Sequence, residues 1–195
     1  MDLRGAAVYE VEPKDSDIRI LVYRAGTLAR FGHNHVMSVA ALSGKVWINP
    51  TLGKSGLALS FPVGQLVVDD PSARKASGED FPADIAASDR DSTRTNMLRA
   101  EVLDAEHFQD ITLKSLKVTG TQAASHILTR ITIRNVSRDI EIPAAMTLDG
   151  PRLVATGEFA IKQTNFGIKP FSVGLGTLQV RDELQVRFKV VALKK

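Results

Sequence analysis

Residues 184–193 read LQVRFKVVAL, and this stretch decides the fold class. Successive side chains of an extended strand point to opposite faces, so alternate residues share one face. The apolar face of this stretch consists of Leu184, Val186, Phe188, Val190 and Ala192. This regular alternation predicts a β-strand that turns one face toward an apolar interior.

Similar alternation recurs upstream as far as Ile18, and it is broken for long only between about residues 72 and 108. The segment 17–24 carries apolar side chains on both faces, which suits a wall between a core and a lumen. Further strands are expected at 36–49 with a bend at Gly44, 57–68, 111–118 with a register slip near Ser115, 127–133, 139–143 after a turn at 135–138, and 153–161. Many short antiparallel strands usually close into a barrel or sandwich, and a barrel of this size can hold a ligand. We therefore expect an all-β fold, an antiparallel β-barrel of about eight strands.

The interruption begins at Asp69, where the chain becomes rich in small polar residues and in proline and glycine. This composition predicts a long loop over residues 69–88. Asp91 or Ser92 is expected to cap a helix that runs to about Arg99, with Met97 and Leu98 turned toward the body. The prediction is a short helical lid over one end of the barrel.

Length and composition set further bounds. The 195 residues fit one domain, 1–195, and the hydrophobic content of 44% and charged content of 24% are ordinary for a globular protein. The formal net charge is +3, the basic residues are scattered among acids, and only 6% of residues are aromatic. This pattern gives no support to a nucleic-acid partner.

The chain has no cysteine, which excludes disulfides, thiolate zinc sites and cysteine nucleophiles. No apolar run approaches the ~20 residues that a membrane-spanning helix needs, so no transmembrane segment is expected. The start of the chain lacks the basic and apolar regions of a signal peptide. As written, the sequence indicates a cytoplasmic protein, or a periplasmic one if an export signal has been removed.

The sharpest local motif is FGHNH at residues 31–35. His33 and His35 lie two positions apart, so in an extended segment both imidazoles project to the same side and could chelate a divalent metal. Two ligands are not enough, and a third would have to come from His107 or from an acid such as Asp104. The alternatives are recognition of a polar head group by the imidazoles and the Asn34 amide, or a turn cap in which Gly32 permits an unusual backbone angle.

Motifs of common enzymes are missing. The sequence contains no G-x-S-x-G, Walker A, H-E-x-x-H or dinucleotide-binding glycine pattern. The acid pairs 69–70 and 79–80 lie in a polar loop and are expected to be solvated rather than to act as general acid and base. The usual phosphate-binding and hydrolase devices are therefore missing.

Five stretches together resemble the YceI-like domain, also described as the lipid- or polyisoprenoid-binding family. They are YEVEPKDSDIRILVY (9–23), MLRAEVLDAEHFQDITLKSLKV (97–118), LTRITIRNVSRDIEIP (128–143), VATGEFAIKQTNFGI (154–168) and VRDELQVRFKVVAL (180–193). The resemblance implies an extended, lipocalin-like barrel whose lumen binds a long apolar chain, such as an isoprenoid quinone, a polyprenyl lipid or a fatty amide. It implies no catalysis and no cofactor besides the lipid.

Apolar bulk at strand or helix positions marks the candidate lumen residues, whose alternative is plain core packing. We expect the ligand to contact the FGHNH residues Phe31, His33 and His35 together with Leu21, Tyr23, Val39, Trp47, Met97, Leu98, Phe108, Phe159 and Ile161. Trp47 is favoured among them because its indole N–H needs a partner, which a buried mouth can supply.

The function expected from these observations is binding and carriage, or sequestration, of an amphiphilic isoprenoid such as a quinone or polyprenyl lipid. The rival hypothesis is a metal-binding protein or metal-dependent enzyme centred on His33 and His35. A third is an interaction module that uses the barrel exterior, and association of two barrels as a homodimer stays open.

Overall fold

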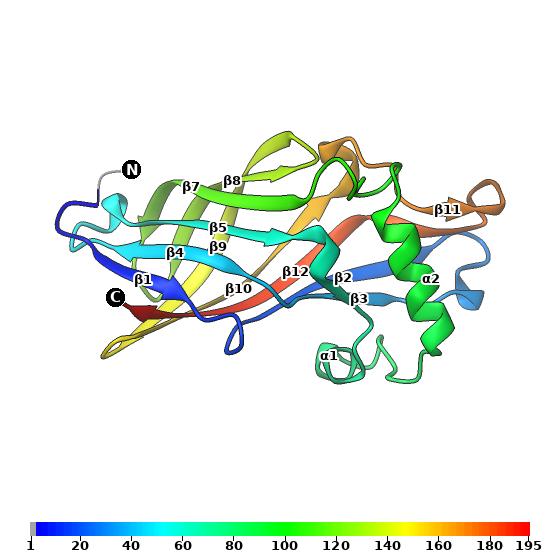
Figure 1. Cartoon of the computed structure of the whole chain (residues 1–195), viewed down its shortest axis with the longest axis horizontal. Coiled ribbons are helices and arrows are strands. Elements are labelled where there is room, and N and C mark those ends of the chain that lie inside the picture. Colours follow the sequence, from blue (N-terminus) through cyan, green and yellow to red (C-terminus); the bar gives the residue numbers. More distant parts are fainter. Residues whose placement is uncertain (1–2) are drawn as a thin grey trace.

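The computed structural model of the chain describes residues 3–195 and contains a closed antiparallel barrel (Figure 1). Eight strands pair in the order β1-β4-β5-β7-β8-β9-β10-β12, and β12 pairs back with β1, where Lys194 lies opposite Tyr9. The strands are β1 (Ala7–Val11), β4 (Ser43–Ile48), β5 (Gly56–Pro62), β7 (Asp110–Gly120), β8 (Ser125–Ile133), β9 (Val136–Asp149), β10 (Arg152–Lys162) and β12 (Leu178–Lys194). The predicted all-β barrel is confirmed, and closure leaves no exposed edge among these eight strands.

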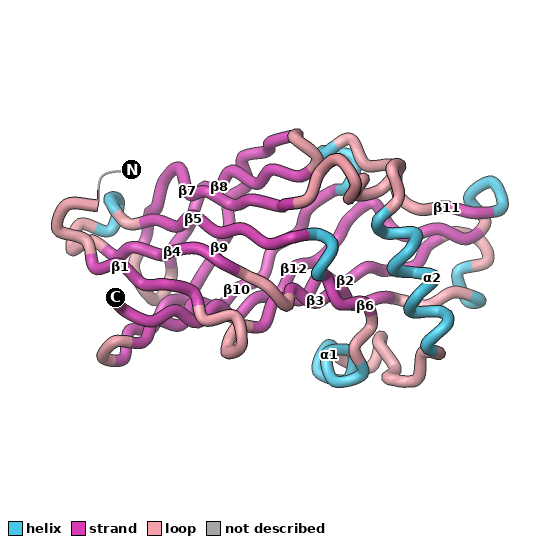
Figure 2. The backbone as a smooth tube through the Cα atoms, viewed as in Figure 1, coloured by secondary structure: helices cyan, strands magenta, loops and turns pink. Residues whose placement is uncertain are grey.

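Three more strands extend the wall from β12, in the order β2 (Asp17–Ala25), β3 (His35–Val39) and β6 (Leu66–Val68). The two-residue strand β11 (Ser172–Val173) pairs only with β12. Figure 2 shows that this extension and the β11 hairpin lie at the end of the molecule remote from both termini. The end formed by these elements is called the mouth end below.

Two helices accompany the sheet, α1 (Pro71–Ser77) and α2 (Ala87–Leu98). The prediction missed α1, although Asp70 caps it by accepting hydrogen bonds from the backbone N–H groups of Ser72 and Ala73 at 2.9 and 3.1 Å. It also began α2 too late, because α2 starts at Ala87 without any side-chain cap.

Helix α2 lies across the mouth end and is tied to the sheet by one arginine. The Arg94 guanidinium donates to the carbonyl oxygen of Leu66 at 2.7 Å and to that of Gly64. These bonds satisfy one backbone carbonyl of β6 and one of the connection before it, and they hold the helix in place. The predicted helical lid is therefore present.

The expected long strand at 36–49 is in fact two strands. β3 ends at Val39 and β4 begins at Ser43, because the chain leaves the wall extension and crosses to the barrel strand beside β1. No register shift marks a bulge at Gly44 where β4 pairs with β5, but the residue is special in another way, since its φ is +126° and an added Cβ would lie 2.1 Å from the Ala58 carbonyl oxygen. Only glycine fits this close approach of β4 to β5.

Two further local predictions concern β8 and its neighbours. The predicted slip near Ser115 is present as a register shift between Ser115 and Lys117 where β7 pairs with β8. The predicted hairpin is also present, but its turn is shorter than expected and consists of Arg134 and Asn135, both with positive φ (51° and 60°). A two-residue turn of this kind matches the twist of the flanking strands.

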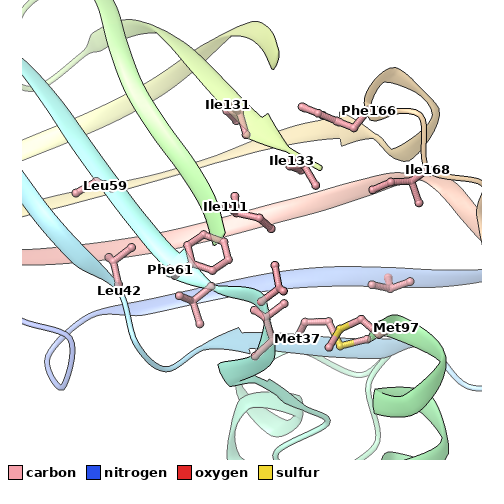
Figure 3. Packing of buried hydrophobic residues seen from close by; sticks show 14 of the residues in the cluster. Met37, Leu42, Leu59, Phe61, Met97, Ile111, Ile131, Ile133, Phe166 and Ile168 are labelled. Atoms are coloured by element: carbon pink, nitrogen blue, oxygen red, sulfur yellow. The ribbon is translucent and has the colours of Figure 1, made fainter. Parts of the chain in front are cut away.

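The main hydrophobic core lies inside the wall, where inward side chains of most strands meet. Figure 3 shows Phe61, Ile111 and Ile133 turned toward the same interior, with Met37 and Met97 beside them. A separate small cluster lies on the outer face of the wall, where Leu21 and Val36 are buried against Phe81 and Ala73 of α1 packs beside them. The wall near α1 is thus apolar on both faces, as the two-sided pattern of residues 17–24 predicted.

No helix in the described chain, residues 3–195, is both long and apolar enough to cross a membrane.

Candidate functional site

The barrel interior contains a deep cavity of about 130 Å³. Apart from Ser55, Thr129 and Gly56, every residue that lines it is apolar. The Ser55 hydroxyl accepts the backbone N–H of Asn49 at 2.9 Å, and the Thr129 hydroxyl donates to the Ile127 carbonyl at 3.2 Å. Both hydroxyl groups are therefore engaged by the backbone, and the cavity is suited to a hydrocarbon chain.

A second cavity, of about 160 Å³, lies at the mouth end beneath α2. Four isoleucines line both cavities: Ile20, Ile111, Ile133 and Ile161. They come from β2, β7, β8 and β10, and we call them the isoleucine waist. The two cavities therefore adjoin at this waist, and we call them together the lumen.

The mouth cavity differs from the deep cavity because polar side chains take part in its lining. These are His35, Thr93, Asn96 and Gln163. Gln163 donates its side-chain N–H to the Arg181 carbonyl at 2.8 Å, which fixes its amide. An apolar lumen with polar groups at one end matches an amphiphile with one polar end.

His35 is held by a buried charge cluster behind it. Its Nδ1 lies 2.7 Å from Oδ2 of Asp69, while Oδ1 of Asp69 accepts the backbone N–H of Val36 at 2.9 Å and an Arg74 N–H at 2.5 Å. Asp69 and Arg74 are both 0% exposed, and Asp69 has a positive φ of 53°. Arg74 also donates to the carbonyl oxygens of Pro82 (2.6 Å) and Asn34 (2.7 Å), so the cluster anchors the α1 segment to β3.

The electrostatics of this cluster fix the state of Asp69. Burial by itself raises the pKa of the carboxyl, but hydrogen bonds from His35, Val36 and Arg74 outweigh burial and hold the pKa below its usual value. Asp69 is therefore a carboxylate and accepts the Nδ1–H of His35. In a neutral imidazole this leaves Nε2 as a hydrogen-bond acceptor at the mouth cavity.

Asp69 was expected to be a solvated loop acid, and the structure corrects this. The residue ends the β6 segment and folds back onto β3, where its own N–H donates to the Val36 carbonyl at 2.8 Å. The sequence offers one signal, because Asp69 directly follows the apolar run Leu66–Val68. In the structure, burial continues past the end of this strand to Asp69. Sequence reasoning also missed Arg74, Asn96 and three of the four waist isoleucines, Ile20, Ile111 and Ile133, as residues of the site.

The FGHNH motif is divided by the structure. His35 lines the mouth cavity, but His33 is exposed with its ring centre 6.4 Å from that of His35. Phe31 is 66% exposed, and Arg30 stacks on its ring. Asn34 is occupied structurally, because it accepts the Arg24 N–H at 2.9 Å and donates to the Asp80 carbonyl at 3.0 Å. The turn-cap role thus applies to Asn34, but Gly32 has an ordinary extended backbone (φ −107°), so the expected unusual angle there is wrong. Within the motif, a head-group role is open only to His35.

The metal alternative finds no support in the geometry. Within residues 3–195, no group of three or more histidine or acidic side chains could hold a metal ion. His107 and Asp104, the suggested third ligands, bond to each other at 2.8 Å.

Three of the apolar candidates line the lumen. Phe159 faces the deep cavity, Met97 faces the mouth cavity, and Ile161 belongs to the waist between them. Val39 and Leu98 pack with the main core but line neither cavity. For these two residues, plain core packing describes their position.

Besides the exposed Phe31, four further apolar candidates lie outside the lumen. Leu21 and Tyr23 belong to the outer face of β2 and pack with Phe81, because the unpredicted α1 segment covers that face. Trp47 does find a partner for its indole N–H, the Lys54 carbonyl at 3.2 Å, but it lies outside both cavities against Gly56. Phe108 is half-buried between His107 and the Arg134 guanidinium.

Comparison with known proteins agrees with this architecture. The family model described as the YceI-like domain matches residues 9–192. The chain belongs to the YceI-like family. The predicted resemblance is therefore confirmed, and the match spans the barrel, the wall extension and both helices.

Solved structures support the YceI-like fold at low sequence identity. BcnA of Burkholderia cenocepacia is 14% identical with a TM-score of 0.68, and the alignment covers 93% of this chain and 99% of BcnA. The YceI protein of Campylobacter jejuni is also 14% identical, with a TM-score of 0.58 and coverage of 82% and 84%. A mutant of that protein with a monobromobimane guest has a TM-score of 0.59 at the same identity and coverage. No curated protein matches this YceI-like chain.

Proposed function

We propose that this YceI-like barrel binds an amphiphilic lipid of the isoprenoid class, with its apolar chain in the lumen, and carries or sequesters it without chemical change. The observation that carries the proposal is the pair of cavities that adjoin at the isoleucine waist, apolar in depth and polar only at the mouth. A metal-centred function has no comparable arrangement within residues 3–195.

The energetics favour a long apolar ligand. Burial of apolar surface contributes ~25 cal/mol per Å², so a chain that buries several hundred Å² needs no charged anchor. The lining is dominated by branched aliphatic side chains, with Phe61, Phe159 and Phe188 as its aromatic members. Such a wall excludes water and gives little directional preference, so lumen length and width select the guest.

The polar head is expected to lie beside His35, in the mouth cavity. Asp69 orients the imidazole so that Nε2 is the free ring nitrogen, and Thr93 and Asn96 of α2 line the same cavity. A neutral Nε2 accepts a hydrogen bond, so it favours a head group that carries a hydroxyl. Asn96 can donate to or accept from the same group.

A binding role is also supported by what the deep cavity offers a guest. Its two hydroxyl groups are bonded to the backbone, and no charged side chain lines it. Catalysis generally requires donors or charges aimed at the place where charge develops. The deep cavity instead offers an apolar environment that suits a hydrocarbon chain.

Native mass spectrometry followed by solvent extraction tests the proposal. We expect the gently purified protein to carry a lipid of defined mass, and the stripped protein to take up a polyprenol at one molecule per chain. A stripped protein that takes up neither polyprenols nor isoprenoid quinones would contradict the proposal. A bound lipid that leaves chemically altered would contradict the non-enzymatic part alone.

A further inference from the structure

Large apolar side chains stand in solvent at the mouth end. Leu28 and Phe31 lie on the turn between β2 and β3, Val173 ends β11, and Leu175 lies on the turn between β11 and β12. Phe31 is 66% exposed and Leu175 is 108% exposed, the two highest values among the large hydrophobic residues of positions 3–195. Single exposed apolar residues are ordinary, but a cluster of this kind marks an interaction surface.

The two turns form one surface because they are bonded to each other. The Leu28 N–H donates to the Thr177 carbonyl at 2.8 Å. Gly26 lets the turns approach so closely that an added Cβ would lie 2.5 Å from the same oxygen. Figure 1 shows these turns at the end opposite both termini. We call residues 28–31 and 173–175 the mouth rim.

The backbone at Leu175 holds this side chain outward. Its φ of 55° lies in the left-handed region, which a Cβ disfavours and where glycine or asparagine is the usual choice. Gly174 and Gly176 flank it and also have positive φ. A fully exposed leucine in this conformation buries no apolar area in the isolated protein. Its side chain can be buried only against the surface of another molecule.

Positive charge surrounds the mouth rim. Arg30 lies 4.8 Å above the Phe31 ring, Arg24 donates to the Gly32 carbonyl, and Arg99 and Lys169 line the adjoining surface groove. None of these four cations forms an ion pair with a carboxylate in the described part of the chain. Glu101 is the one acid that lines the groove. Exposed apolar side chains that are surrounded by unpaired cations complement a surface that is both anionic and apolar.

The mouth rim adjoins the mouth cavity. A groove of about 550 Å³ is lined by Arg99, Glu101, Val102 and residues 169–176, which include the tip at Leu175. Val102 and Phe171 line both this groove and the mouth cavity. An apolar chain that enters along the groove would therefore reach the mouth cavity and then the isoleucine waist.

We propose that the mouth rim docks this protein onto the surface of an anionic lipid bilayer, with Phe31 and Leu175 inserted among the acyl chains and Arg30 and Lys169 on the head groups. This proposal goes beyond lipid binding in the lumen, because a barrel can hold a lipid without contacting a membrane. The docked orientation places the groove at the bilayer surface, where a lipid can exchange with the lumen.

Co-sedimentation with vesicles tests the docking. The full chain is mixed with vesicles of phosphatidylcholine alone or of phosphatidylcholine with phosphatidylglycerol. We expect binding to the anionic vesicles that weakens as salt is raised, because salt screens exposed charges. Leu175→Asp should lower the vesicle-bound fraction at least about tenfold, since a leucine side chain that docking would bury among the acyl chains is replaced by a charge. Aspartate tolerates the left-handed backbone, so this variant should fold normally.

The matched control is Leu148→Asp. Leu148 is 39% exposed on the β9–β10 strand end, at the opposite end of the molecule, and its replacement should leave vesicle binding unchanged. Equal loss in both variants, or no binding of the unmodified protein to anionic vesicles, would overturn the docking proposal. A dimer in size-exclusion chromatography that Leu175→Asp converts to a monomer, without any vesicle binding, would assign the rim to a second copy and also overturn it. Polyprenol uptake in detergent solution is measured in parallel, so failure of docking and failure of lumen binding give different results.

Discussion

Nδ1 of His35 lies 2.7 Å from Oδ2 of Asp69, and this contact connects the mouth cavity to charged groups that are fully buried. The histidine belongs to β3, whereas Asp69 follows β6 and accepts a hydrogen bond from Arg74 of α1. One carboxylate thus sets the orientation of a lumen residue and fastens α1 to the wall. Stability and ligand recognition share this residue and can be separated by mutation.

Asp69→Asn should destabilise the protein by about 3–5 kcal/mol at neutral pH, because it leaves the buried Arg74 guanidinium without its counter-charge. The effect should depend on pH with a definite sign. The pKa of Asp69 is lower in the folded protein than in the unfolded chain, so its contribution is present above the unfolded pKa and is lost as pH falls through the folded pKa. Urea denaturation of both proteins at a series of pH values measures the difference.

The free-energy gap between the wild-type protein and Asp69→Asn should therefore narrow below pH ~4. The double variant Asp69→Asn with Arg74→Met is the control, because it removes the uncompensated charge and should recover part of the stability. A gap that stays constant with pH would show that the carboxylate charge is not what Asp69 contributes.

His35→Phe should weaken the binding of ligands with a polar head group and should not weaken the binding of apolar ligands. We expect the affinity for a hydroxyl-bearing polyprenol to fall about five- to tenfold, which corresponds to one hydrogen bond of about 1 kcal/mol. A hydrocarbon of the same length, which has no polar head, should bind equally well to both proteins. Competition with a fluorescent apolar probe measures both affinities.

His33→Phe is the matched control for that experiment, since His33 is exposed and lines neither cavity. The two histidines lie in the same short segment, so general effects on the segment should be similar in both variants. Equal loss of polyprenol affinity in both would contradict a specific role for the oriented Nε2 of His35.

The strand alternation allowed prediction of the wall, because it depends on a period of two that tertiary contacts do not alter. Residues 184–193, 127–133 and 153–161 all lie in the expected strands. The break between β3 and β4 was missed because residues on both sides are apolar and no proline marks it. The same ambiguity hid α1, whose residues resemble a polar loop until the Asp70 cap and Pro71 are considered together.

The site was harder to predict than the wall, because alternation gives two faces but does not say which face is the lumen. Leu21 and Ile20 are equally apolar neighbours, yet Ile20 reaches the waist and Leu21 packs under Phe81. The outer layer that decides this comes from a segment some fifty to sixty residues later in the chain. Asp69 was missed for a related reason, since nothing local indicates that Arg74 and Val36 will surround it.

Gly44→Ala should destabilise the barrel by about 1–3 kcal/mol or more, because the residue has a φ of +126° and its new Cβ would clash with the Ala58 carbonyl. Gly64→Ala is the control, since no atom lies within 4 Å of an added Cβ there and its φ is not in the disfavoured range. Thermal unfolding followed by circular dichroism compares them. Similar melting temperatures for the two variants would contradict the close approach of β4 to β5 at this position.

Ile161→Phe should close the lumen at the isoleucine waist. Ile161 lines both cavities at the isoleucine waist, so a larger side chain there closes the passage between them. We expect the affinity for long polyprenols to fall at least about tenfold, while a prenol short enough for the mouth cavity should lose much less affinity. Ala160→Phe provides the control, because Ala160 is the exposed neighbour on the opposite face of β10. Binding measured across a series of chain lengths should show a cut-off in Ile161→Phe alone, and a uniform loss at every length would indicate that the two cavities do not act as one passage.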